Sequence, residues 1–473
     1  MRNIRTFLSR TLVVSCLALR LFSFADDASA SAKTETMSIT MSEGIDLSDS
    51  AAVTRFKMNH PDVNVDVQSI STLHDDIAER LLARDDTIDL YRLDANLGIL
   101  PYMRDKGYFL DLSGNKDIRE FTQAMAPVFQ NQMSVNGQIM GVPSFILFEY
   151  PIVFNPAVAQ AIGLKQEEIP TNLLDLLKFV NRWDDEYADR FPDYQPFYAT
   201  DAGSYALSYL NPYASIVLEM YKDTMLAQGQ TLRYDTPLFD ELLQEIEPWT
   251  IRHDSDTGDQ DNTGGVIDPS QCLFFSTQAF SDEVFNACET GNIISLPLVE
   301  GAPLVQAYEL ECVIVNPATA HPEAAMELAG AYATDCDPYL LRILCPDVNE
   351  PYQDPNYQAK LNDLLDLKEQ DETRLSKADP ATKKDIEFDL NNLNASIKEE
   401  EAHPYAITAK AISEYRAQIQ PYLVPLGESV YESEAAYAET MHYMIDCLQG
   451  GISITQCGQQ LDAFLQKLEA EGE

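Results

Sequence analysis

The first part of the chain alternates between extended and helical patterns, and this order limits the fold more than any other feature. Short strands are predicted at Met37–Met41, Val63–Val67 and Ile88–Tyr91, where apolar residues alternate with polar ones or cluster. Helices are predicted between them at Ala51–Asn59 and Thr72–Arg84. Because parallel neighbouring strands need a crossover helix, we expect an α/β fold with a mostly parallel sheet.

A different pattern covers residues 355–401, which are highly charged and carry leucine and isoleucine at helical spacing. Ile386, Leu390, Leu393 and Ile397 are four, three and four residues apart, which places them on one face of a helix. A break at Ala378–Pro380 separates this helix from a preceding one. We therefore expect an inserted helical hairpin, either a docking element or, as we favour, a solvated arm.

The charge of the chain narrows its partners. The sequence has 473 residues, and its 76 Asp and Glu against 32 Lys and Arg give a formal net charge of −44. Nucleic acids and anionic lipids are bound mainly by Lys and Arg, so neither is an expected partner. The hydrophobic share of 45% and the length predict at least two packed domains.

The N-terminus differs from everything that follows it. The only charged residues among its first 25 are four arginines, and the stretch from Thr11 to Ala25 is largely apolar. We interpret residues 1–32 as a signal peptide and leader, with cleavage after Ala25, Ala30 or Ala32. A lipid anchor at Cys16 is the less favoured alternative, because the apolar stretch before it is short. Either interpretation predicts an exported protein, extracellular or associated with the cell envelope.

Seven cysteines remain after Cys16, all from Cys272 onward. Cys336 with Cys345 and Cys447 with Cys457 are candidate local disulfides in an oxidising compartment. The alternative is that most of the seven are small buried apolar residues.

Motifs of catalysis and cofactor binding are lacking. The sequence has no nucleophile elbow, Walker loop, zinc-protease motif or dinucleotide-binding glycine motif. Its six histidines are scattered without paired spacing. The acidic stretch Asp254–Asn262 resembles a calcium loop only imperfectly, and a flexible loop is the favoured interpretation. We therefore predict no catalytic residue, no cofactor and no metal.

Aromatic residues in predicted loops suggest a ligand class. The chain has 23 Tyr and 20 Phe but only 2 Trp, and many rings lie near acids and amides. Rings can stack on the apolar faces of sugars while neighbouring polar side chains bind hydroxyl groups. Most rings in any protein belong to the core, so this pattern alone does not identify a sugar site.

The order of several segments resembles one known family. Asn136–Pro143 resembles the motif DGKIYGLP, and Phe154–Leu174 resembles the block YNKDLFEKAGL followed by PPKTWDEL, although Leu173 replaces its tryptophan. Asn316–Ala325 resembles the strand end and helix start with NPEAA. Together these blocks resemble the extracellular solute-binding proteins of ABC sugar importers, the group that includes maltose-binding protein.

The resemblance implies a two-lobed, periplasmic-binding-protein-like fold of type II, each lobe a mostly parallel sheet flanked by helices. Lobe 1 would comprise residues 33–148 and 310–346, and lobe 2 residues 149–309 and 347–473, including the hairpin. Crossing segments are expected near Phe145–Tyr150, Val305–Glu311 and Cys345–Tyr352.

The resemblance also implies a ligand site between the lobes. Local alignment gives eleven substrate-binding candidates: Glu43, Arg92, Asp94, Asn96, Glu149, Tyr150, Asp201, Tyr205, Gln278, Phe280 and Tyr308. For Glu149 the alternative is a structural hinge contact, and for Phe280 a core position at a helix start.

The implied function is capture of a carbohydrate, with an oligosaccharide favoured, and its delivery to the membrane permease of an ABC importer by a monomer without catalysis. Three alternatives remain open at this point. One is a secreted carbohydrate-active enzyme with an acid pair across a cleft. Another is an acidic interaction protein of the cell envelope that uses the helical hairpin and has a vestigial cleft. The last is a protein of the same fold that binds a peptide or polyamine.

Overall fold

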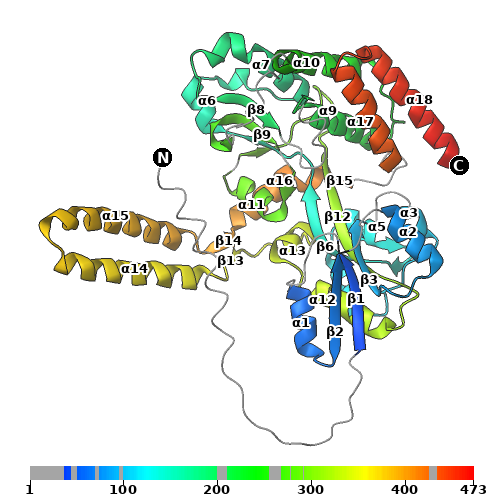
Figure 1. Cartoon of the computed structure of the whole chain (residues 1–473), viewed down its shortest axis with the longest axis horizontal. Coiled ribbons are helices and arrows are strands. Elements are labelled where there is room, and N and C mark those ends of the chain that lie inside the picture. The colour runs from blue at the N-terminus through cyan, green and yellow to red at the C-terminus, as the bar shows by residue number, and fades with distance from the viewer. Residues whose placement is uncertain are drawn as a thin grey trace, which may run out of the picture. The chain divides into compact units, whose positions relative to one another are not determined.

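The structure is a computed structural model, shown in Figure 1. It describes residues 37–43, 51–69, 74–94, 100–199, 210–254, 268–276, 278–290, 292–425 and 434–472. The described residues form two main sheets, each with its own buried cluster, together with two two-stranded sheets and a helical hairpin.

The large sheet has the strand order β10-β6-β12-β3-β1-β2, with β15 beside β12. Its strands are β1 (Met37–Glu43), β2 (Val63–Ser69), β3 (Leu90–Asp94), β6 (Val142–Phe148), β10 (Ala279–Phe280), β12 (Gln306–Val315) and β15 (Leu423–Pro425). β1 and β3 are parallel, whereas β12 is antiparallel to both β3 and β6. The α/β fold is confirmed, but the sheet is mixed rather than mostly parallel. The reason is that β6 leaves this sheet toward the small sheet and β12 returns from it in the opposite direction.

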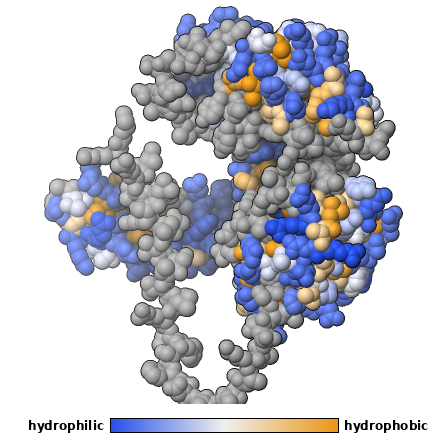
Figure 2. All heavy atoms as spheres, turned by 45° about the vertical axis from the view of Figure 1, so that its right-hand side comes forward, coloured by the Kyte–Doolittle hydropathy of each residue, from blue (hydrophilic) through white to orange (hydrophobic). Residues whose placement is uncertain are grey.

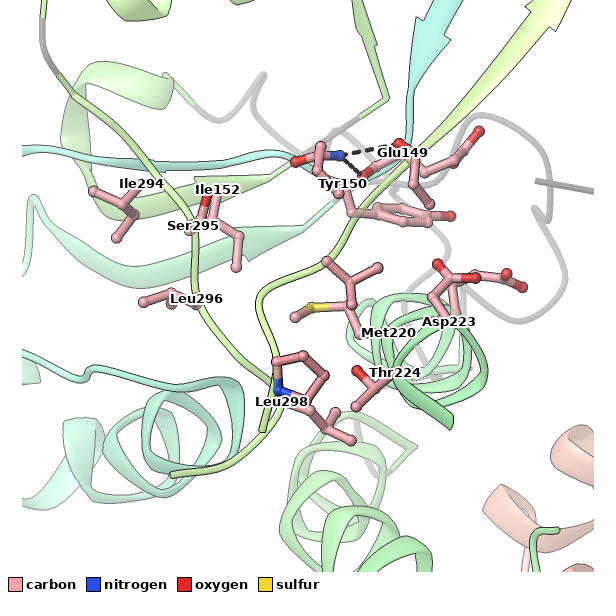
Figure 3. Close-up of a pocket in the computed structure, with 15 residues that line it drawn as sticks. Glu149, Tyr150, Ile152, Met220, Asp223, Thr224, Ile294, Ser295, Leu296 and Leu298 are labelled. Carbon is pink, nitrogen blue, oxygen red and sulfur yellow. Dashed lines mark hydrogen bonds between the residues drawn. The ribbon is translucent and has the colours of Figure 1, made fainter. Parts of the chain in front are cut away.

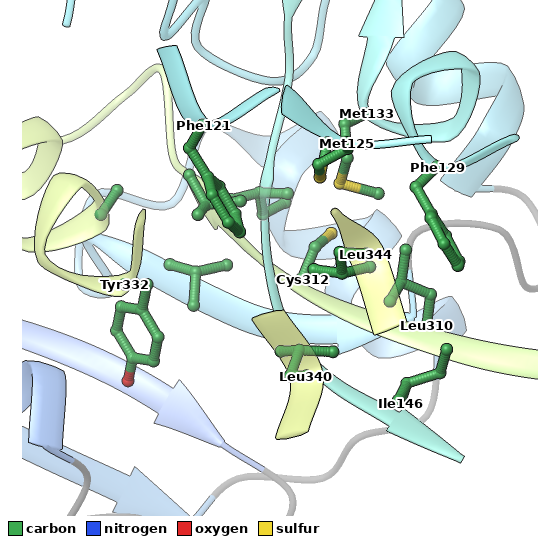
Figure 4. Close-up of a cluster of buried hydrophobic side chains, with 14 of the residues drawn as sticks. Phe121, Met125, Phe129, Met133, Ile146, Leu310, Cys312, Tyr332, Leu340 and Leu344 are labelled. Atoms are coloured by element: carbon green, nitrogen blue, oxygen red, sulfur yellow. The ribbon is translucent and has the colours of Figure 1, made fainter. Parts of the chain in front are cut away.

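Helices pack around the large sheet and form the first core with it. They are α1 (Ala51–Asn59), α2 (His74–Ala83), α3 (Leu100–Asp105), α4 (Lys116–Ala124), α5 (Pro127–Met133), α11 (Ser281–Thr290), α12 (Pro322–Thr334), α13 (Pro338–Leu344) and α16 (Ala409–Gln418). Figure 4 shows part of this core, in which Phe129 of α5 lies near Leu310 of β12, and Met133 of α5 lies beside Met125. On β6 and β12, alternate side chains point to the same face of the sheet, and this directs Ile146 and Leu310 into the core.

The small sheet has the order β11-β7-β9-β8. Its strands are β7 (Ile152–Phe154), β8 (Gln195–Ala199), β9 (Cys272–Ser276) and β11 (Ile293–Ile294). Its helices, which form the second core, are α6 (Pro156–Ile162), α7 (Leu173–Trp183), α9 (Ala214–Ala227), α10 (Pro237–Asp254), α17 (Glu434–Leu448) and α18 (Ile454–Gly472). Asn172 caps α7 by accepting a hydrogen bond from Asp175 N at 2.9 Å, as its position before the apolar run predicts.

The expected hairpin is confirmed as α14 (Tyr357–Lys377) and α15 (Pro380–Ala402), which pack side by side in Figure 1. Ile386, Leu390 and Ile397 are buried along one face of α15. The short strands β13 (Tyr352–Gln353) and β14 (Tyr405–Ile407) pair at its base. The remaining short elements are β4 (Ser134–Val135), β5 (Gln138–Ile139), η2 (Gln166–Glu168), η3 (Asp184–Ala188), η4 (Pro269–Gln271) and η5 (Gln420–Tyr422).

Among the described residues, three segments connect the two sheets. They run from β6 to β7 through Glu149–Pro151, from β9 to β10 through Gln278, and from β11 to β12 through residues 295–305. The expected third crossing at Cys345–Tyr352 is wrong, because Cys345 lies in the first core and the chain continues through the hairpin to α16 in that same core. The first core also includes residues of α11 and α16, which lie within the predicted boundaries of lobe 2.

The described surface in Figure 2 is mostly hydrophilic, as the many acidic residues of the sequence lead us to expect. On the face shown in Figure 2, the described side chains are mostly hydrophilic, with hydrophobic ones scattered among them. In the described part of the chain, no helix combines the length and apolar character that crossing a membrane requires.

Candidate functional site at the connections between the sheets

All three described connections meet at Glu149, where β6 ends. The Glu149 amide donates to Ala307 O at 3.0 Å, and Gln306 Nε2 donates to Glu149 O at 2.7 Å. Gln278 Nε2 contacts both carboxylate oxygens of Glu149, at 2.9 and 3.1 Å. We call Glu149, Gln278, Gln306 and Ala307 the Glu149 junction. A single residue thus joins three segments that are far apart in the sequence.

The backbone just after Glu149 is unusual. Tyr150 has a φ of 47°, in the left-handed region that residues with a bulky side chain rarely adopt. Its side chain is buried and belongs to the second core. The chain therefore turns sharply between the sheets at a residue whose ring is fixed by packing.

A pocket opens beside the junction, on the side of the small sheet (Figure 3). Met220, Asp223 and Thr224 of α9 line one side, and Ile294, Ser295 and Leu296 line the opposite side. Leu298 also lines the pocket. Glu149, Tyr150 and Glu219 also line it. The pocket thus combines apolar walls with three carboxylates, and its described lining contains no Lys or Arg.

Burial and crowding of like charges keep the carboxyl group of Glu149 protonated near neutral pH. Burial, followed by repulsion from Glu219, Glu309 and Asp223, raises the pKa of Glu149 to about 8, although the hydrogen bond from Gln278 opposes this. Burial and then Glu311 raise the pKa of Glu309 to about 7. Glu219 forms an ion pair with Lys222, one turn further along α9. The junction can therefore bind or release protons close to neutral pH.

A second polar group lies on the large sheet. Arg92 of β3 is buried and forms an ion pair with Glu311 of β12 at 2.5 Å. Its Nε donates to Ser144 Oγ at 3.2 Å, and its guanidinium lies 5.4 Å from the centre of the Phe145 ring. The Phe145 ring is in turn 5.6 Å from the ring of Phe280, which is 48% exposed. Arg92 and Phe280 are therefore linked through Phe145, with the Phe280 ring open to solvent.

The structure brings some of the predicted site residues together. Glu149, Tyr150 and Gln278 meet at the junction. Arg92 and Phe280 belong to the second polar group. The backbone of Asp94 pairs with Glu311. Asn96, Asp201 and Tyr205 lie outside the described residues, as does most of the acidic stretch Asp254–Asn262, and so do the side chains of Glu43 and Asp94.

Tyr308 is placed elsewhere. Its side chain is fully buried in the first core, and its hydroxyl donates to Gln132 Oε1 at 2.6 Å. Its neighbour Glu309 points to the opposite face of β12, as strand alternation requires, and belongs to the electrostatic surroundings of Glu149.

Sequence reasoning missed several residues of the junction and pocket. Glu219 and Asp223 are four residues apart on α9, which places them on one helix face. The spacing is visible in the sequence, but a chain with 76 Asp and Glu contains many such pairs, so the spacing alone does not single this pair out. Gln306 has no sequence signal, because its role depends on β12 lying next to the end of β6.

Within the described ranges, no group of three or more His, Cys, Asp or Glu has an arrangement that could hold a metal ion. The carboxylates of the pocket can instead accept hydrogen bonds when ionised and donate one when protonated. The amide of Gln278 and the ring of Tyr150 add a donor and an apolar surface.

Comparison with known proteins identifies the fold. No family model and no curated protein sequence matches the chain. Solved structures do match: the maltose-bound MalE3 of T. maritima has a TM-score of 0.54 at 15% identity, covering 91% of this chain and 100% of that one. The putative binding protein MsmE of Bacillus subtilis has a TM-score of 0.55 at 11% identity, covering 93% and 100%. RafE in complex with raffinose has a TM-score of 0.52 at 14% identity, covering 92% and 100%.

These similarities show that the chain has the two-lobed fold of ABC solute-binding proteins. The resemblance described from the sequence motifs is thereby confirmed at the level of the fold.

Proposed function

We propose that this protein is an exported solute-binding protein that captures a carbohydrate and delivers it to the permease of an ABC importer. The observation that carries the proposal is the likeness in fold over nearly the whole chain to proteins solved with maltose, raffinose and cycloalternan. The N-terminal signal pattern supports export. Catalysis has no part in this function, which needs only selective binding and release.

The chemistry of the junction supports an uncharged, hydroxyl-rich ligand. A protonated Glu149 can donate a hydrogen bond to a hydroxyl group, and Gln278 can donate and accept. Tyr150 and Phe280 offer rings, and Arg92 offers a charged donor beside Phe145. We propose these five residues, together with Glu43, Asp94, Asn96, Asp201 and Tyr205, as the ligand-binding set. Tyr308 is left out because its hydroxyl is engaged inside the first core.

The junction also supports a hinge role. A ligand that contacts residues on both sides of the three connections would stabilise one arrangement of the two sheets. Glu149 would couple ligand binding to that arrangement, because its hydrogen bonds reach all three connections.

A cationic solute is the second candidate. The pocket is lined by Glu149, Glu219 and Asp223, and Glu219 is paired with Lys222, which is not a lining residue. An ammonium group would find acceptors in the carboxylate of Asp223 and, once it is ionised, in that of Glu149. An amino sugar or a polyamine fits this description.

Calorimetric titration of the full chain with a panel of ligands tests the proposal. The panel contains maltose, raffinose, xylo-oligosaccharides, glucosamine, spermidine and a tripeptide. We expect sub-millimolar binding of a neutral oligosaccharide, unchanged sugar in the recovered ligand, and a rise in melting temperature that grows with ligand concentration. Hydrolysis of any sugar would refute the non-catalytic function, and binding of spermidine alone would select the second candidate.

Two matched variants locate the site. Phe280→Ala removes an exposed ring and should weaken binding by about 1 kcal/mol or more if the ring stacks on the sugar. Phe388→Ala removes a ring of the hairpin that is 65% exposed and should leave affinity unchanged. Equal effects of the two substitutions would show that the Phe280 surface is not part of the site.

A further inference from the structure

Two of the buried cysteines lie on neighbouring helices of the second core. Cys447 is in the last turn of α17 and Cys457 in the first turn of α18, and both are free thiols in the structure. Cys457 is fully buried, and Cys447 is 9% exposed. The interaction between the two thiols is the largest cause of the pKa shift of each, which places them next to each other.

The helix geometry explains their contact. Cys457 Sγ lies 3.5 Å from the carbonyl oxygen of Tyr443. In an α-helix that carbonyl faces the amide of residue 447, and the side chain of residue 447 tilts back toward the same turn. The side chain of Cys447 is therefore directed to the place where Cys457 touches α17.

The opposite side of α18 is fixed as well. A Cβ atom at Gly458 would lie only 2.8 Å from Tyr234 O, so the helix approaches this backbone as closely as a glycine permits. Asp462 Oδ1 accepts a hydrogen bond from Tyr234 N at 2.6 Å. These contacts hold α18 in a position that keeps Cys457 against α17.

We propose that Cys447 and Cys457 form a disulfide that fastens α18 to α17. The Cys447 thiolate attacks the disulfide of an oxidant, such as oxidised glutathione or a thiol oxidoreductase, and one thiol of the oxidant leaves. Cys457 then attacks the mixed disulfide, forming the Cys447–Cys457 bond and releasing the second thiol. Two protons and two electrons pass from the protein to the oxidant, which is reduced to two thiols.

The chemistry of the pair agrees with this order of attack. The interaction with Cys457 lowers the pKa of Cys447, whereas the same interaction followed by burial raises the pKa of Cys457. The other candidate pair is less favourable. Burial, then the negative charge of Asp337, raises the pKa of Cys336 well above its usual value.

Peptide mapping distinguishes the two pairs. Trypsin cleaves after Lys and Arg, so Cys447 and Cys457 fall together in one peptide, residues 417–467, as its only cysteines. Arg342 separates Cys336 from Cys345. The full chain is incubated with equal concentrations of oxidised and reduced glutathione, denatured, alkylated and digested.

We expect peptide 417–467 to take up no alkyl group and to be lighter than its reduced form by two hydrogen atoms. Alkylation of both its cysteines, or glutathione retained on either, would overturn the proposal. A second measurement uses the melting temperature with and without dithiothreitol. The difference should persist in Cys336→Ser and vanish in Cys447→Ser and in Cys457→Ser, and the same difference in all three variants would overturn the proposal too.

Discussion

Glu311 and Glu149 are both half-buried carboxylates near the connections between the sheets, but their charge is compensated differently. Glu311 has the guanidinium of Arg92 at 2.5 Å, and this attraction partly offsets the effect of burial, which raises the pKa of Glu311. Glu149 has the neutral amide of Gln278 as its partner and other acids as its neighbours. The first carboxylate is compensated by a fixed cation, and the second by a proton.

The charge compensation of Glu311 is independent of pH on the side of its cation, whereas that of Glu149 changes when the proton leaves. The cation of the ion pair on the large sheet is a guanidinium, and guanidinium groups stay charged throughout the physiological pH range. The proton on Glu149 leaves as the pH rises toward 8 and exposes the junction to repulsion from Glu219, Glu309 and Asp223. We therefore expect pH to act on the connections between the sheets and to leave the large sheet largely unaffected.

The largest expected effect is that of Arg92→Met, which removes the cation and leaves Glu311 without compensation. Breaking a buried pair in this way costs about 3 kcal/mol. Urea unfolding at pH 8 measures the loss of unfolding free energy. Adding Glu311→Gln should restore part of it, because the unpaired charge is then gone.

Lys116→Met is the matched control for Arg92→Met. Lys116 pairs with Glu120 at 3.6 Å on an exposed helix surface, where such a pair contributes little. Similar losses for the two substitutions would contradict the role assigned to the Arg92–Glu311 pair.

Glu149→Gln should increase the free energy of unfolding, whereas Arg92→Met decreases it, and the increase should depend on pH. The folded protein holds the Glu149 proton more tightly than the unfolded chain, because its pKa rises from 4.5 to about 8. The stabilisation from this proton is complete below 4.5 and is lost as the pH rises toward 8. Glutamine keeps a neutral group at every pH, so the variant should gain stability relative to wild type as the pH rises.

Melting temperatures from pH 5 to pH 9 check this prediction, with Glu120→Gln as an exposed control that should follow the wild type in slope. Parallel curves for wild type and Glu149→Gln would show that Glu149 is ionised throughout.

The sequence was most informative where patterns are local. α1 is found at Ala51–Asn59 as predicted, and the spacing of Ile386, Leu390 and Ile397 identified the buried face of α15. Strand direction was less predictable, because β12 becomes antiparallel to β3 and β6 only through the return of the chain from the small sheet. The same return explains the misplaced third crossing, since nothing local to Cys345 indicates which core it enters.

The candidate site was predictable only in part. Family motifs pointed to Glu149, Tyr150 and Gln278, which the structure brings together. Gln306, Glu219 and Asp223 join them through tertiary contacts between distant segments. The core position of Tyr308 follows from its register on β12, where alternation turns Tyr308 inward and Glu309 outward.

Gln278→Ala should have a smaller effect than either charge substitution. It removes the amide that contacts both carboxylate oxygens of Glu149, and a hydrogen bond of this kind contributes about 1 kcal/mol to stability. Because that bond lowers the pKa of Glu149, its loss should move the pH-dependent step in melting temperature to higher pH. Gln130→Ala, which removes an amide donor to Met125 O on the large-sheet side, should leave the position of this step unchanged. A step that shifts equally in both variants would disconnect Gln278 from Glu149.

Glu309→Gln should give the smallest effect, and it tests whether Glu309 and Glu149 are electrostatically coupled. Glu309 repels Glu149, and burial followed by Glu311 raises the pKa of Glu309, so Glu309 interacts with a carboxylate of each region. Removing its charge should lower the pKa of Glu149 by less than about one unit, because its contribution is smaller than that of burial or of Glu219. Carboxyl carbon chemical shifts, followed by NMR across pH 5 to pH 9 in chains labelled at glutamate, measure the midpoint directly, with Glu149→Gln assigning the resonance. A Glu149 midpoint that stays unchanged would mean that Glu309 does not couple the junction to the Arg92–Glu311 pair. In that case the contrast between them would arise from local burial alone.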